Sequence, residues 1–227
     1  MSLDKKTLIG VVGGTGKLGF ALARRWAKAG YPVIIGSRTE EKARAVAAEL
    51  SAELGQQIDS AANPEAAARA SLVVVTVPYS AQAETLHEIR ANVLGKIVVD
   101  TTVPLQPPKV MRVQLPEEGS AAKCALAVLG EDVRLVSAFH SVAAHKLATD
   151  AEIACDVMVF GDDKDARAAV VQLADDAGLR GIHAGALCNA VAAEALTSIL
   201  IFVNKTYAVD GAGIQFTGDL IIPREDV

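Results

Sequence analysis

Short runs of β-branched residues alternate with amphipathic stretches through the first half of the chain, and this alternation restricts the possible folds most strongly. Four runs have the composition of strands, at residues 8–12, 32–37, 72–78 and 96–102, and two more follow at residues 134–139 and 156–161. Three stretches between the first four have the pattern of helices, at residues 16–30, 39–54 and 81–90. Strands that alternate with helices form a parallel sheet through right-handed crossovers. The sequence therefore predicts an α/β fold, a Rossmann-type doubly wound parallel sheet.

A glycine-rich loop joins the first predicted strand to the first predicted helix. Gly14, Gly16 and Gly19 form the pattern G-x-G-x-x-G in a βαβ unit of roughly thirty residues. Such glycines let the backbone approach a pyrophosphate, whose charge is met by the N-terminus of the helix. A triphosphate-binding loop needs Ser or Thr after its lysine, but Lys17 is followed by Leu18. The loop predicts a dinucleotide site, and the alternative interpretation is a plain turn.

The end of the second predicted strand indicates which dinucleotide binds. An NAD site places an Asp or Glu here, whereas a 2′-phosphate requires hydroxyl and guanidinium donors. Ser37, Arg38 and Thr39 occupy this position, and the first acidic residue is Glu40. Arg38 can bind a phosphate through two parallel N–H groups. Lys42 adds a cation one turn into the next helix, unless it is simply an exposed helix lysine. We therefore predict NADP.

Several residues lie at or just after the carboxyl ends of later predicted strands, at the edge where open α/β sheets bind ligands. They are Thr76, Val77 and Pro78, then Thr101, Thr102 and Pro104, and finally His140. A structural turn is the alternative interpretation for each. We interpret His140 as a hydrogen-bonding positioner, because no carboxylate or serine is spaced nearby to complete a proton relay. A separate helix is expected to begin at Asn63 as its N-cap, with Pro64 in its first position.

The second half of the chain contains a long apolar stretch at residues 186–203. Its length approaches that of a membrane span, but Asn189, Glu194 and Thr197 interrupt it, so we predict a buried or subunit-facing helix. A short second domain could cover little of this helix, which favours a homodimer. We place the domain boundary near residue 141. A dinucleotide-binding domain of residues 1–140 then precedes a small, mainly helical portion of residues 141–227.

Composition and charge argue against several other functions. The formal net charge of −5 offers no basic surface for nucleic acid. The three cysteines have wide, unpatterned spacings, which disfavour a disulfide framework. No cluster of His, Cys, Asp or Glu has the spacing of metal ligands. We therefore expect a cytoplasmic protein without a metal, a nucleic-acid partner or a membrane anchor.

Blocks along nearly the whole chain resemble the NADPH-dependent coenzyme F420 reductases. They include "IGVVGGTGKLGFALARRWAKAGYPVIIGSRTEEKA", "VVTVP", "KIVVDTTVP", "SAA", "VSAFHSVAA", "CDVMVFGDD", "LRGIHAGALCNAVAAEALTSILI" and "GAGIQF". The first block is shared with many NADP-binding folds, and the later blocks are more particular to this family. The resemblance implies an oxidoreductase that transfers a hydride between NADP(H) and a deazaflavin, coenzyme F420. Two flat rings held about 3–3.5 Å apart in a dry cleft suffice for this chemistry.

The resemblance also implies the site residues. It assigns the 2′-phosphate of NADP to Thr15, Ser37, Arg38 and Lys42. It assigns the deazaflavin pocket to His140, Val142, Thr197 and Ala212, with His140 and Thr197 as positioning candidates and no certain catalytic residue. The full predicted cofactor-binding set adds Gly14, Gly16, Lys17, Leu18, Thr76, Val77, Pro78, Val103 and Ala144.

Three departures from the family pattern concern the hydride partner. Tyr79 stands where the family often has Trp, the segment His140–Ala144 lacks the family's proline, and residues 217–227 extend past Phe216. Two alternatives therefore stay open. One is an NADPH-dependent reductase of another acceptor, such as a flavin, an imine or a carbonyl. The other is a non-catalytic NADPH-binding module.

Overall fold

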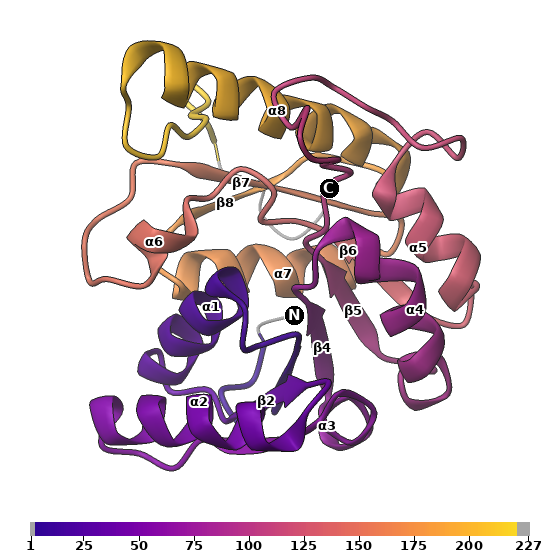
Figure 1. Cartoon of the computed structure of the whole chain (residues 1–227), viewed down its shortest axis with the longest axis vertical. Helices are drawn as coiled ribbons and strands as arrows, with labels where there is room; N and C mark the ends of the chain where they lie inside the picture. The colour runs from indigo at the N-terminus through magenta and orange to yellow at the C-terminus, as the bar shows by residue number, and fades with distance from the viewer. Residues whose placement is uncertain (1–2, 222–227) are drawn as a thin grey trace.

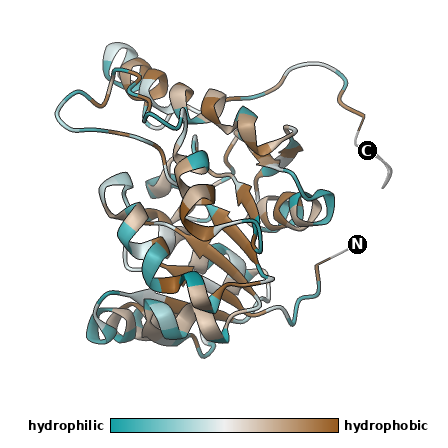
Figure 2. Ribbon diagram, turned by 90° about the vertical axis from the view of Figure 1, so that its right-hand side faces the viewer, coloured by the Kyte–Doolittle hydropathy of each residue, from teal (hydrophilic) through white to brown (hydrophobic). Residues whose placement is uncertain are grey.

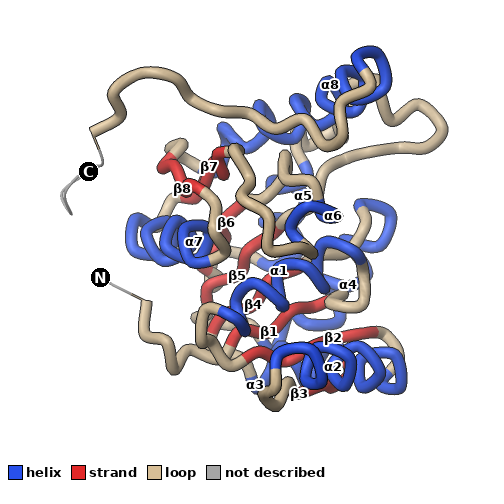
Figure 3. Tube along the Cα trace, turned by 90° about the vertical axis from the view of Figure 1, so that its left-hand side faces the viewer, coloured by secondary structure: helices blue, strands red, loops and turns tan. Residues whose placement is uncertain are grey.

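The computed structural model of the chain describes residues 3–221. These residues form one sheet with helices on both faces (Figure 1). Within these residues the eight strands have the order β3-β2-β1-β4-β5-β6-β7-β8 (Figure 3). Their bounds are β1 Ile9–Val12, β2 Val33–Ser37, β3 Asp59–Ala62, β4 Leu72–Val75, β5 Ile97–Asp100, β6 Arg134–Ser137, β7 Asp156–Gly161 and β8 Arg180–His183. The predicted Rossmann-type α/β architecture is confirmed.

The helices divide between the two faces of this sheet. Their bounds are α1 Lys17–Lys28, α2 Glu40–Leu54, α3 Asn63–Arg69, α4 Tyr79–Ile89, α5 Ala121–Leu129, α6 Ala144–Leu147, α7 Lys164–Asp176 and α8 Ala190–Tyr207, with short 3₁₀ turns at Arg90–Asn92 and Leu187–Asn189. Side chains of α1, α2 and α7 form the core of one face. Those of α3, α4, α5 and α8 form the core of the other. The strands are apolar throughout the interior (Figure 2) because both of their faces are covered.

The sheet is parallel only as far as β6. β7 runs antiparallel to β6, with Ser137 opposite Phe160, and β8 runs parallel to β7. The expectation of a wholly parallel sheet is therefore wrong for the last two strands. The reason lies in residues 138–155, whose short helix α6 packs on α1 instead of crossing the sheet. The chain consequently enters β7 at the same edge of the sheet where it leaves β6, so β7 must run in the opposite direction to β6.

Two elements have no signal in the local sequence. The segment Asp59–Ala62 contains no β-branched residue, yet it forms β3 by pairing in parallel with β2. Helix α6 has only four residues and shows no periodicity. Both elements exist because a neighbouring strand or helix supplies their partners, which is a tertiary effect.

The position proposed as a domain boundary lies inside a continuous structure. β6 and β7 pair across it, and the apolar core beside α1 contains residues from both sides. The buried Trp26 indole donates to the carbonyl of Leu173 over 2.9 Å, which joins α1 to α7. The residues before and after this position therefore share one sheet and one core.

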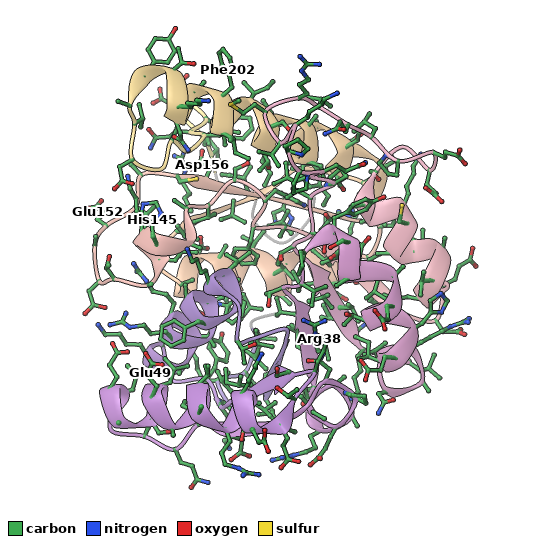
Figure 4. The ribbon with its side chains drawn as sticks, viewed as in Figure 1. Arg38, Glu49, His145, Glu152, Asp156 and Phe202 are labelled. Atoms are coloured by element: carbon green, nitrogen blue, oxygen red, sulfur yellow. The ribbon has the colours of Figure 1, made fainter. Side chains whose placement is uncertain are left out.

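Helix α8 packs against α5 and β7 on one side and leaves an apolar surface on the other. By length and composition the segment Leu187–Tyr207 could cross a membrane, and 28% of its apolar 18-residue stretch is buried in the protein. Its buried residues include Glu194 and Ser198, whereas Ile199 and Phe202 are about half exposed, at 48% and 51%. Figure 4 shows Phe202 on the outer side of this helix.

The segment after α8 returns to the start of β7. The backbone N–H of Phe216 donates to the Asp156 carboxylate over 2.6 Å, and Arg180 binds both that carboxylate and the carbonyl of Phe216. This junction fixes the chain at Phe216, the position after which the sequence departs from the family pattern. Of that extension, residues 222–227 lie outside the described part.

Candidate functional site

Two adjoining cavities open at the carboxyl edge of the parallel strands. The first has a volume of about 440 Å³ and is lined by residues of the glycine loop, the end of β2 and the segment after β4. The second has a volume of about 700 Å³ and is lined by the segments that follow β4 and β5. Thr76, Val77 and Pro78 line both cavities. Because the two cavities share this wall, a ligand bound in the first can extend into the second.

Tight packing shapes the glycine loop into a cradle. A Cβ atom at Gly19 would lie 2.5 Å from the Thr76 hydroxyl, and one at Gly13 would lie 2.6 Å from Val77. Gly13 also has a φ of +74°, which disfavours other residues. Helix α1 begins at Lys17 with Gly16 as its N-cap and has no side-chain cap. Its first N–H groups are therefore free to bind an anion, as a pyrophosphate requires.

Two cations stand beside this cradle. Ser37 is buried at the end of β2, while Arg38 and Lys42 are exposed and line the first cavity. Arg38 is labelled in Figure 4. Within residues 3–221, neither Arg38 nor Lys42 forms an ion pair, although Arg44 nearby pairs with Glu40 over 2.9 Å. Two such cations with hydroxyl neighbours fit a phosphate monoester, so these residues fit the 2′-phosphate of NADP.

Asn63 is a feature of this cavity that the sequence did not reveal as part of the site. Its carboxamide does not cap α3, because Ala62 is the N-cap and Asn63 is the first helical residue. This corrects the expected capping role, whereas Pro64 does lie in the first turn. The Asn63 Oδ1 atom instead accepts a hydrogen bond from the N–H of Gly13 over 3.2 Å.

The second cavity has an aromatic side chain among its lining residues. Tyr79, the first residue of α4, lines it together with residues of the loop that follows β5. Burial, and then the nearby Cys124 thiol, raise the pKa of Tyr79 to about 12. Cys124 in turn donates to the Glu118 carboxylate over 3.2 Å. Tyr79 is therefore a neutral phenol in the working pH range, able to donate a hydrogen bond.

A buried polar network lies behind the second cavity. Asp100 accepts hydrogen bonds from the Thr102 hydroxyl and from Gln82, each over 2.6 Å, and Thr102 lines the cavity. Glu194 of α8 accepts from the N–H groups of Ala121 and Ala122 at the start of α5, over 2.7 and 3.0 Å. Burial raises the pKa of Asp100 to about 6 and that of Glu194 to about 7. The network ties α8 to the edge of the sheet.

His140 and Thr197 are brought together, but not as two side chains that face a ligand. The Thr197 hydroxyl donates to the backbone carbonyl of His140 over 3.1 Å. The His140 imidazole is 8% exposed, and its Nε2 lies 2.7 Å from the Ser137 hydroxyl. The expectation that no serine stands near His140 is therefore wrong, because the strand end turns Ser137 back toward it. Burial lowers the pKa of His140 to about 4, so the ring is neutral.

The predicted cofactor residues divide by location. Eight of them line the first cavity: Thr15, Gly16, Ser37, Arg38, Lys42, Thr76, Val77 and Pro78. Leu18 and Val103 line the second cavity. Neither lining contains Gly14 or Lys17. Gly14 donates its N–H to the carbonyl of Gly36 over 2.9 Å, and this hydrogen bond holds the glycine loop against β2.

The residues predicted for the acceptor lie elsewhere. Val142 packs against the core beside α1, and Ala144 begins α6. The N–H of Ala212 donates to the Asn204 side chain over 2.7 Å. The two cavity linings include none of Val142, Ala144, Ala212, His140 and Thr197. His140, Val142 and Ala144 follow β6, Thr197 belongs to α8, and Ala212 lies in the segment after α8.

Comparison with known proteins agrees with this geometry. A glycine cradle, a cationic cavity and a second cavity at the same sheet edge are the features of an NADP-dependent oxidoreductase. Residues 8–104 match the family described as NADP oxidoreductase coenzyme F420-dependent. The chain belongs to the family of F420-dependent NADP reductases, as its curated relatives demonstrate.

Two of these relatives are named F420-dependent NADP reductases. The protein from Methanothermobacter thermautotrophicus is 41% identical, over 92% of this chain and 94% of the relative. The protein from Methanocaldococcus jannaschii is 36% identical, over 92% and 97%. A crystal structure from Arthrobacter sp. FB24, provisionally assigned as an F420-dependent NADP-reductase, has a TM-score of 0.79 and 25% identity, and the match covers 93% of this chain and 99% of that one.

Proposed function

We propose that this protein transfers a hydride between NADPH and the deazaflavin coenzyme F420. The observation that carries the proposal is the shared wall of Thr76, Val77 and Pro78 between a cationic cavity and a larger neighbouring one. A donor ring held against this wall faces the second cavity, where an acceptor ring can stack on it. When bound, the nicotinamide supplies the hydride, and the net reaction consumes one proton: F420 + NADPH + H⁺ gives F420H₂ + NADP⁺.

The protein's contribution in this proposal is binding and orientation. The start of α1 binds the pyrophosphate, while Ser37 and Arg38, with Thr15, bind the 2′-phosphate directly. Lys42 adds a positive charge to this part of the cavity. His140 and Thr197 act as positioning residues, because their hydrogen bond fixes α8 against the end of β6. Val142, Ala144 and Ala212 support the same region from α6 and the C-terminal segment.

Turnover with the authentic coenzyme tests this proposal directly. Purified protein, NADPH and oxidised coenzyme F420 are expected to lose the near-ultraviolet absorbance of the reduced nicotinamide, and NADH is expected to react far more slowly. Flavins, imines and carbonyl compounds serve as competing acceptors. Tight NADPH binding without turnover of coenzyme F420 would contradict the proposal and favour one of the two alternatives.

We also propose that the protein is a cytoplasmic homodimer joined through α8. Ile199 and Phe202 expose an apolar strip on this helix, and Val113 and Leu115 of the loop after β5 are 46% and 47% exposed. A second copy would cover such a strip symmetrically. Sedimentation is expected to give a dimer for the wild type and a monomer for Phe202→Glu, while a monomeric wild type would contradict this assignment. The three cysteines are free, as in a reducing compartment.

A further inference from the structure

The Asn63 carboxamide lies between the two phosphate-binding parts of the first cavity. On one side its Oδ1 atom accepts the N–H of Gly13 in the glycine cradle. On the other side a Cβ atom at Gly36, the residue before Ser37, would lie 3.0 Å from the same Oδ1 atom. Asn63 also lines the cavity itself, together with Arg38 and Thr15. A side chain at this position faces the part of the ligand that connects its pyrophosphate to its 2′-phosphate.

The nitrogen of this carboxamide is a buried donor. Asn63 is 1% exposed, and within residues 3–221 its Nδ2 atom makes no hydrogen bond. The orientation of the amide is determined, because only Oδ1 can accept the Gly13 N–H. A buried amide donor without an acceptor is costly, and such groups are rare in folded proteins. The cavity side of Asn63 therefore calls for a ligand oxygen.

We infer that Asn63 is a cofactor-binding residue whose Nδ2 donates a hydrogen bond to a ribose oxygen of the adenosine half of NADP. This inference rests on the proposed function only in taking NADP as the ligand. In NADP the adenosine ribose is the group that joins the pyrophosphate to the 2′-phosphate. The glycine cradle and the Ser37–Arg38 pair hold these two groups, so the ribose lies over Asn63.

The same side chain shapes the empty site and contacts the ligand. Its oxygen fixes the N–H of Gly13, whose left-handed backbone begins the cradle. Its nitrogen contacts the ribose. Asn63 thus couples the shape of the pyrophosphate cradle to occupation of the adenosine subsite.

The substitution Asn63→Asp separates the two roles. The carboxylate is isosteric and still accepts the Gly13 N–H, but it replaces the donor with a second acceptor. We expect binding of both NADPH and NADH, measured by fluorescence titration without any deazaflavin, to weaken roughly tenfold to a hundredfold. The loss is expected to shrink relative to wild type as the pH falls, because the introduced carboxyl group can donate again once it is protonated. A role confined to shaping the Gly13 cradle would not give this pH dependence, because the side chain accepts the Gly13 N–H in either ionisation state.

The matched control is Arg38→Ala, which removes a 2′-phosphate donor and is expected to weaken NADPH binding but not NADH binding. Loss confined to NADPH in Asn63→Asp would assign the donor to the 2′-phosphate and overturn the ribose assignment. Wild-type affinities in a folded Asn63→Asp protein would overturn the inference altogether. If the Asp variant does not fold, Asn63→Ala removes the donor together with the acceptor of the Gly13 N–H, and unchanged affinities for NADPH and NADH would again overturn the inference. Failure of wild-type protein to bind NADPH would instead refute the proposed function.

Discussion

The dinucleotide cavity and the region around His140 form opposite electrostatic environments within one site. In the described part of the chain, Arg38 and Lys42 stand exposed at the cavity without carboxylate partners. The His140 ring and the Glu194 carboxyl group are buried. Burial lowers the pKa of His140 and raises the pKa of Glu194, so it favours the neutral form of each group. The first region therefore binds through charges kept free for a ligand. The second holds its shape through hydrogen bonds among buried groups whose charged forms are disfavoured by burial.

The largest expected effect tests the buried region through pH. Below pH 6.5 the unfolded chain binds a proton at His140 that the folded protein, with a pKa of about 4, does not bind. As the pH falls through this window, stability should therefore decrease by about 1.4 kcal/mol per pH unit from this group alone. Asp100 and Glu194 have raised pKa values and act in the opposite direction, so the wild-type curve is a sum.

The variant His140→Gln isolates that contribution, because its amide can still bond to the Ser137 hydroxyl. Denaturant unfolding of both proteins from pH 7 to pH 4 should show the wild type losing about 3 kcal/mol relative to the variant. Parallel curves would mean that His140 is not buried in its neutral form.

The next effect tests the charged region. Arg38→Ala removes a charge-assisted contact to the 2′-phosphate and should weaken NADPH binding by about 1.5–3 kcal/mol, with little change for NADH. Calorimetric titration with both cofactors measures the difference. Equal losses for the two cofactors would show that Arg38 acts through the fold and not through the phosphate.

The smallest effect distinguishes a residue that contacts the 2′-phosphate directly from one that attracts it only through long-range electrostatics. Lys42 is exposed on α2, so Lys42→Ala should weaken NADPH binding only about twofold at low salt, and the difference should vanish at high salt. The loss in Arg38→Ala should largely survive high salt. A salt-resistant loss in Lys42→Ala would indicate that Lys42 also binds the phosphate directly.

The same contrast explains what the sequence could predict. The glycine loop, Ser37 and Arg38 are recognisable because they are neighbours along the chain and obey local geometry. Asn63 acts on Gly13 across 50 residues, and Glu194 acts on Ala121 across 73. No local pattern encodes these contacts. The strand Asp156–Gly161 has its predicted bounds. Its direction depends on how residues 138–155 pack, and the sequence pattern does not indicate that packing.

The reversed direction of β7 has a consequence for protein engineering. The chain leaves the cofactor edge along β7 and again along β8, and it comes back along α8, where Thr197 meets the carbonyl of His140. A chimera that takes α8 alone from a relative would pair a foreign helix with a native strand end. Exchange of residues 138–216 as one cassette keeps the outward strands and the returning helix from a single parent, together with the hydrogen bonds that join them to His140 and Phe216.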